Sequence, residues 1–160
     1  DKLGGGSLPG EKECVFLNGS RVANCEGDFM VLTRPEGRSV FEEMAAEGDF
    51  EGFEIEDIGS KTGMLGLYGP LAVEVLDRII PLKTGDMSSS EVRCLNLFMI
   101  KITIIRGSWT GGDGIELICP SGAAGLAGGA ISKYRDREGI VAGGMEALMK
   151  LMGGGVQADT

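Results

Sequence analysis

Glycine constrains this chain more than any other residue type. It occupies 28 of the 160 positions, more than twice the usual share of about 7%. Glycine supplies the backbone conformations of tight turns and weakens helix interiors. We therefore expect many turns and no long, stable helix. Since 42% of the residues are hydrophobic, the chain can still bury a core, and its length suits one domain.

Two features of the composition exclude whole classes of function. The chain has no histidine, which rules out a Ser-His-Asp triad and a histidine-ligated zinc site. We expect no metal site. The net charge of −9 argues against nucleic acid as a partner, because an acidic surface repels phosphates. No apolar run reaches the roughly 20 residues that span a membrane, so we expect no membrane partner.

The four cysteines are Cys14, Cys25, Cys94 and Cys119. None of them forms a C-x-x-C pair, and each lies in an apolar stretch, as is typical of buried free thiols. Free thiols suit a reducing compartment, and no signal peptide is visible at the start of the sequence. We therefore expect a cytoplasmic protein.

Alternating or continuous apolar runs bounded by turn residues predict the strands. An Asn18-Gly19-Ser20 turn joins the first two, because Asn-Gly favours the tight turns of hairpins. Residues 92–106 predict either two strands or one bent strand. The strands expected are 14–17, 21–25, 29–33, 53–58, 64–68, those within 92–106, and 115–119.

Four helices are expected between and after these strands. The first is expected to begin at Ser39, which forms a capping-box pattern with Glu42 three residues later. Pro70 suits the first position of a second helix, with Leu71, Val75, Leu76 and Ile79 on one face. The others cover residues 122–134, which are weakened by four glycines, and residues 144–152. Without regular βαβ alternation, the expected fold class is α+β with a largely antiparallel sheet.

Three candidate site residues lie in or beside the loop 109–114, and two interpretations stay open for Glu116 and for Trp109. Glu116 either points to solvent from the polar face of its strand or accepts paired N–H bonds from a ligand. Trp109, the only tryptophan, is either a core residue or a stacking platform for a flat ligand. Asp113 is suited to accepting N–H groups of its own turn. The loop is no phosphate-binding loop, because G-x-x-x-x-G-K-[ST] is absent.

Two segments together resemble the aminomethyltransferase family, the T proteins of the glycine cleavage system. Residues 66–76 read G-L-Y-G-P-L-A-V-E-V-L, similar to that family's L-Q-G-P-x-A-x-x-V-L. Residues 105–120 read I-R-G-S-W-T-G-G-D-G-I-E-L-I-C-P, similar to R-x-G-Y-T-G-E-D-G-x-E-I-x-x-P. The glycine-rich residues 1–12 predict a flexible lead-in, and the resemblance implies a T-protein-like folate-binding domain at 13–153, followed by a tail at 154–160. We expect no counterpart of the family's C-terminal barrel in these residues.

The resemblance implies tetrahydrofolate as the cofactor and assigns residues to its site. Glu116 would bind the pterin, with Trp109 as a flat wall and Asp113 in the same loop. Val31 and Thr33 would line the pocket. Asn24 stands where the family has a catalytic Asp, and an amide cannot carry the charge that stabilises a cationic intermediate.

Two further positions depart from the family pattern, because Gly112 replaces an acid and Met145 replaces an Arg. The function implied is tetrahydrofolate-dependent transfer of an aminomethyl or methyl group, with folate and a lipoyl carrier protein as partners. The alternative is a folate-binding protein without catalysis, or a subunit completed by another chain.

Overall fold

The computed structural model describes residues 8–17, 19–47, 52, 54–80, 82–97 and 99–154. Its strands are β1 (Cys14–Leu17), β2 (Ser20–Cys25), β3 (Asp28–Leu32), β4 (Thr62–Tyr68), β5 (Val92–Leu97), β6 (Ile100–Arg106) and β7 (Gly114–Pro120). Its helices are the 3-10 helix η1 (Pro35–Gly37) and the α-helices α1 (Arg38–Glu47), α2 (Ala72–Ile79), α3 (Ser121–Glu138) and α4 (Met145–Gly154). The expected α+β class is confirmed, and the strand pairs of both sheets are antiparallel.

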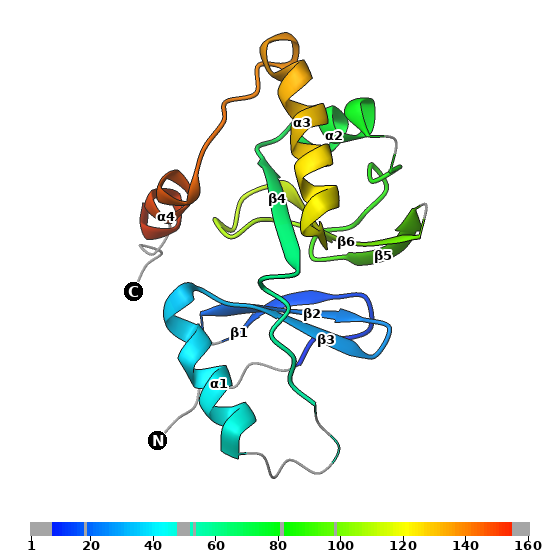
Figure 1. The fold of residues 1–160 in the computed structure, drawn as a ribbon. Coiled ribbons are helices and arrows are strands. Elements are labelled where there is room, and N and C mark those ends of the chain that lie inside the picture. Colours follow the sequence, from blue (N-terminus) through cyan, green and yellow to red (C-terminus); the bar gives the residue numbers. More distant parts are fainter. Residues whose placement is uncertain are drawn as a thin grey trace.

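Two sheets lie against each other in layers (Figure 1). The first has the order β1-β2-β3 and the second the order β4-β7-β6-β5. Successive side chains of a strand alternate between its faces, so each sheet turns one set of residues toward the other. The buried residues of this interlayer core are Cys14, Ala23, Val92, Ile105 and Ile118.

The other face of the second sheet packs against α2 and α3 (Figure 1). Seven buried residues form that core: Ala72, Leu76, Leu82, Met87, Ile104, Ile115 and Leu117. The second sheet is thus covered on both faces, and its central strand β7 is buried from Gly114 to Cys119. Leu71, expected on the apolar face of α2, is instead the N-cap and is exposed, because the helix begins at Ala72.

Helix α3 is longer than the glycine content suggests, at 18 residues. Its packing explains how it forms. A Cβ atom added at Gly63 of β4 would lie 2.6 Å from the Cβ of Ala124 in α3. The small residues on both sides therefore let the helix lie directly on the strand, and tertiary packing overrides the weak helix propensity.

The predicted tight turn after β1, and a second one after β5 that was not predicted, are consistent with the strand registers. Leu17 pairs with Ser20, and Leu97 pairs with Ile100, so each turn has two residues. Gly19 has a φ of +77°, as such turns require, while Asn18 lies outside the described residues. Residues 92–106 form two strands rather than one bent strand.

The strand expected at 53–58 is wrong. Phe53 lies outside the described residues, and residues 54–58 form no strand. Their acidic side chains pair with surface cations instead: Glu56 with Lys61, and Asp57 with Arg38. The sequence of this segment alternates between apolar and acidic residues, but residues 54–58 pair with no strand of either sheet.

The capping box expected at Ser39 is also absent. The chain enters α1 through η1, so the helix begins at Arg38 and Ser39 lies inside its first turn. Glu42 bonds to the side chain of Arg38 at 2.8 Å. Among the described residues, no helix has the length and apolar character that a membrane crossing needs.

Candidate functional site

Strand β7 carries Glu116 into the interior between the two sheets. Its neighbours in register are Gly66 of β4 and Ile105 of β6, and Ile105 belongs to the interlayer core. Glu116 is 0% exposed. The solvent-facing interpretation is therefore wrong, because β7 is a central strand with cover on both faces rather than an edge with one wet face.

Both carboxylate oxygens of Glu116 accept hydrogen bonds. Nη1 of Arg21, on β2 in the facing sheet, donates to Oε2 and forms an ion pair that is buried on both sides. The Tyr68 hydroxyl donates to Oε1 at 3.0 Å. Charge-assisted bonds of this kind are roughly twice as strong as neutral ones.

Two aromatic rings flank the guanidinium of Arg21. Its Cζ lies 5.5 Å from the centroid of Phe16 and 5.9 Å from that of Trp109. The two rings meet edge to face, with centroids 6.1 Å apart. Within about 6 Å, a cation over a ring face is attracted by the ring's quadrupole. Trp109 is thus a flat wall beside a charged, planar group and is not enclosed in the apolar core.

The glycines of the two recognised motifs make room for Tyr68. A Cβ atom at Gly114 would lie 2.8 Å from the Tyr68 ring, and one at Gly66 would meet its hydroxyl. The ring therefore lies across both positions, which brings the hydroxyl to Glu116. A side chain larger than hydrogen at either glycine would displace this donor.

Burial dominates the protonation behaviour of the cluster. It raises the pKa of Glu116, and the charge of Arg21 is the largest opposing influence. Burial, together with the neighbouring charge of Glu116, raises the pKa of Tyr68. Burial also raises the pKa of the Cys14 thiol, which lies beside Arg21. Tyr68 therefore keeps its proton and is a hydrogen-bond donor, and Glu116 is the acceptor of that bond.

Asp113 holds the loop that precedes β7. It pairs with Arg106 at 2.8 Å and accepts the backbone N–H of Gly114 at 2.9 Å. Within the same loop, Ser108 donates to the carbonyl of Gly112 at 2.9 Å. These bonds fix the turn that carries Trp109.

The structure does not bring Asn24 to Glu116. Asn24 lies three residues beyond Arg21 on β2, so the two side chains lie on opposite faces of the first sheet. Its amide nitrogen donates to the carbonyl of Pro9 at 3.3 Å, and its oxygen accepts from the N–H of Gly27 at 3.1 Å. The side chain therefore has a structural role at the β2–β3 turn.

Val31 and Thr33 are likewise on the outer side of the first sheet. Val31 pairs in register with Val22, one residue away from Arg21 in the alternation, and is exposed. Thr33 accepts a hydrogen bond from Ser20 at 3.2 Å. Of the residues expected at the site, Glu116 and Trp109 come together, and Asp113 lies in their loop.

Sequence reasoning did not place Arg21, Phe16 or Tyr68 at the site. Arg21 carries a usable signal. It shares its strand face with Ala23 and Cys25, where alternation calls for apolar side chains, and it is 3% exposed. A lone cation in such a pattern indicates a buried anionic partner.

Two of the four cysteines are not free. Cys25 of β2 and Cys94 of β5 form a disulfide between the two sheets, with Cα atoms 6.4 Å apart, while Cys14 and Cys119 are free and buried. The residues of the pair are 69 positions apart in sequence, and only the packing of the sheets brings them together. The expectation of a reducing compartment loses part of its basis.

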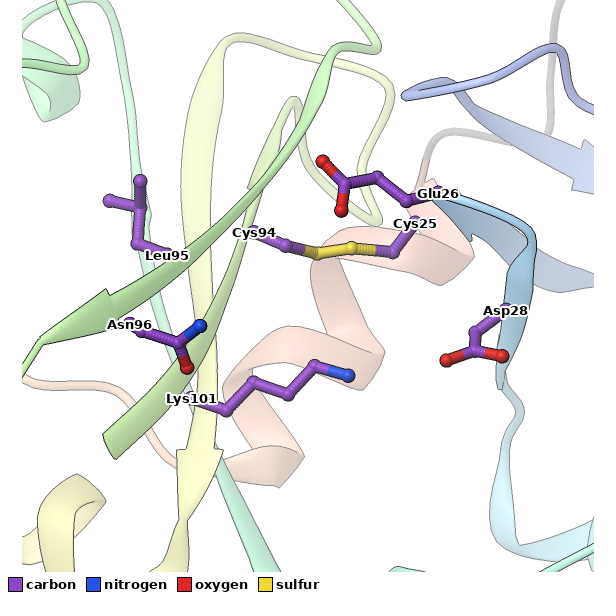
Figure 2. A pocket seen from close by; sticks show the side chains of 7 residues that line it. All are labelled: Cys25, Glu26, Asp28, Cys94, Leu95, Asn96 and Lys101. Carbon is purple, nitrogen blue, oxygen red and sulfur yellow. A yellow bond between two sulfur atoms is a disulfide. The ribbon is translucent and has the colours of Figure 1, made fainter. Parts of the chain in front are cut away.

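A polar pocket of about 300 Å³ lies beside this disulfide and is separate from Glu116. Figure 2 shows the side chains of Glu26, Asp28, Asn96 and Lys101 around the sulfur atoms.

Comparisons with known proteins agree with this fold. Residues 19–152 match the family described as the GCVT N-terminal domain, and the chain belongs to that family. It is similar to the aminomethyltransferase of Geobacillus kaustophilus, with 30% identity over 127 residues, 79% of this chain and 31% of the relative. The aminomethyltransferase of Chlorobium phaeovibrioides is 29% identical over 127 residues, 79% of this chain and 32% of the relative. The chain thus spans about a third of the length of these relatives.

Proposed function

We propose that this chain binds tetrahydrofolate at Glu116 and forms the folate-binding part of a one-carbon transferase of the aminomethyltransferase type. The observation that carries the proposal is the complete burial of Glu116, a carboxylate behind the Trp109 loop and in a motif similar to that of the family. A buried charge is costly unless it is paired, and in the free chain Arg21 and Tyr68 supply the donors that such a carboxylate needs.

The chemistry of the carboxylate suits a pterin. The edge of a pterin presents an amine and a ring N–H side by side, and a carboxylate accepts two such parallel bonds. A carboxylate has about four acceptor positions. Arg21 and Tyr68 take one position on each oxygen, which leaves capacity for a ligand. Because Glu116 is fully buried, the Trp109 loop has to move when the ligand enters.

The rest of the reaction is proposed from the relatives as a whole. An aminomethyl donor on a lipoyl carrier protein, and another chain or segment supplying the barrel, would complete the site. We keep residues 13–153 as the proposed domain and the cytoplasm as the proposed location. Val31 and Thr33 remain proposed lining residues, which would then serve a part of the folate beyond the pterin.

A second candidate function is folate binding without transfer. The amide of Asn24 is held by Pro9 and Gly27 and lies on the opposite face of β2 from Arg21. A side chain committed in this way is not available to a reacting folate nitrogen. This arrangement favours a protein, or a subunit, that holds folate while the chemistry occurs elsewhere.

Calorimetric titration with tetrahydrofolate tests the proposal. Glu116→Ala should weaken binding by about 1–3 kcal/mol, the penalty for leaving buried donors without an acceptor. That loss is about 5- to 150-fold in affinity. Glu74→Ala, which removes an exposed carboxylate on α2, is the matched control and should bind like the wild type.

Unchanged affinity in Glu116→Ala would remove Glu116 from the site. A transfer assay with a lipoyl carrier then separates the two candidates. Turnover by the wild type supports the transferase, whereas binding with no turnover supports the folate-binding protein.

A further inference from the structure

Arg21 is the least expected residue of the Glu116 cluster. It extends from the first sheet into the second, is 3% exposed, and ion-pairs with a carboxylate that is 0% exposed. Its Nε is buried without a hydrogen-bond partner. A buried donor without an acceptor costs free energy. The guanidinium therefore uses only some of its N–H donors in this position and is not bound as tightly as it could be.

The guanidinium of Arg21 has the same shape as one part of a pterin. It is a planar carbon bearing three nitrogens, with N–H donors arranged as a fork that fits a carboxylate. The 2-amino-pyrimidinone ring of a pterin has the same unit, a carbon bound to an exocyclic amine and two ring nitrogens. Both groups are flat, both donate to carboxylates, and both stack on aromatic rings.

The surroundings of Arg21 provide these contacts. Glu116 accepts from its Nη1, and the rings of Phe16 and Trp109 lie 5.5 and 5.9 Å from its Cζ. We infer that the guanidinium of Arg21 occupies, in the free chain, the subsite in which Glu116 holds the amino-pyrimidinone edge of a pterin. This inference rests on the proposed function and deepens it: the ligand binds by displacing a side chain of the protein.

A route for displacement exists beside Arg21. Its neighbour in register on β1 is Phe16, which is 54% exposed. Rotation of the Arg21 side chain past this ring brings the guanidinium to solvent, where all its donors are hydrated. The ligand in turn supplies Glu116 with the donors that Arg21 withdraws. While Arg21 occupies the subsite, the ligand cannot bind there. The apparent affinity for the ligand is therefore the intrinsic affinity multiplied by the fraction of molecules whose subsite is open.

The test compares pterin binding in the wild type, Arg21→Ala and a control. The ligand is 2-amino-4-hydroxypteridine, titrated by calorimetry. If Arg21 leaves the site open in about a tenth of the molecules, its removal increases affinity about tenfold. Arg78→Ala, which removes a half-exposed arginine from surface ion pairs on α2, should bind like the wild type.

A second readout uses guanidinium itself as the probe. Millimolar guanidinium chloride, compared with equal sodium chloride, should raise the unfolding temperature of Arg21→Ala and not that of the wild type. It should also compete with the pteridine in the variant. Trp109, the only tryptophan, lies beside the subsite and reports its occupation by fluorescence.

The outcomes separate this inference from the proposed function. If the wild type and Arg21→Ala bind the pteridine equally, or the variant binds it more weakly, the inference fails and the folate proposal stands. If neither protein binds the pteridine or tetrahydrofolate, the proposed function fails and the inference fails with it. Should Arg21→Ala not fold, Arg21→Lys decides, because it keeps the charge opposite Glu116 and removes the planar group. Lys at this position should also increase affinity for the pteridine.

Discussion

Replacement of Arg21 by Met isolates the energetics of the buried cluster. Both partners of the Arg21–Glu116 pair are desolvated, at 3% and 0% exposure. Removal of one partner leaves a buried charge uncompensated and should lower the free energy of unfolding by about 3–5 kcal/mol. For a chain of this size, that loss corresponds to a fall of about 6–20 °C in the unfolding temperature.

The loss should depend on pH. Burial already raises the pKa of Glu116, and Arg21 is the strongest influence against that rise, so the variant should show a larger rise. A carboxyl whose pKa is raised in the folded state contributes stability below its unfolded pKa and loses that contribution as the pH rises through the folded pKa. Arg21→Met should therefore be weakest at neutral and alkaline pH, and should recover as the pH falls toward the ordinary value of 4.5.

Urea unfolding followed by Trp109 fluorescence, at about pH 8 and about pH 5, measures both effects. Addition of Glu116→Gln to Arg21→Met should recover most of the loss at the higher pH, because the variant then holds no buried charge. The control, Arg78→Met, should change stability little, as exposed pairs do. A loss in Arg21→Met no larger than that of this control, or equal at both pH values, would show that the pair is not a buried ion pair.

Three further changes test the surroundings of the site. Tyr68→Phe removes a hydrogen bond to a buried carboxylate and should cost about 1.5–3 kcal/mol in urea unfolding; a cost near zero would contradict the bond. Gly114→Ala should destabilise, since the new Cβ would lie 2.9 Å from a backbone carbonyl, whereas Gly129→Ala, in open space within α3, should stabilise by about 0.5–1 kcal/mol; the opposite order would contradict the packing. Asn24→Asp removes a buried amide donor and should cost about 1–3 kcal/mol, and calorimetric scanning that finds no loss would contradict its structural role.

The sequence predicts the seven described strands and the motif of the candidate site, because these depend on local pattern, but the same pattern also predicts a strand at 53–58 that the structure lacks. Alternation and turn residues locate the β1–β2 hairpin, and the T-G-x-D-G-x-E spacing singles out Glu116 as a candidate. The burial of Glu116 was not predictable in this way. It depends on β7 lying at the centre of the second sheet, between β4 and β6, which is a property of strand order and not of any one strand.

Contacts between the two sheets were also not predictable from the sequence. Arg21 and Glu116 are 95 residues apart, and Cys25 and Cys94 are 69 apart. No local signal joins such pairs, since each depends on how two sheets face each other. The glycines of α3 show the same limit, because Gly63 on another element supports a helix whose own propensity is poor.

A crystal structure of this chain with tetrahydrofolate would show directly whether Glu116 binds the pterin. We expect pterin density against the Trp109 ring, its amine and ring N–H within hydrogen-bonding distance of Glu116, and the Arg21 side chain turned outward past Phe16. Pterin bound elsewhere, with the Arg21–Glu116 pair intact beneath an unmoved Trp109, would contradict this expectation.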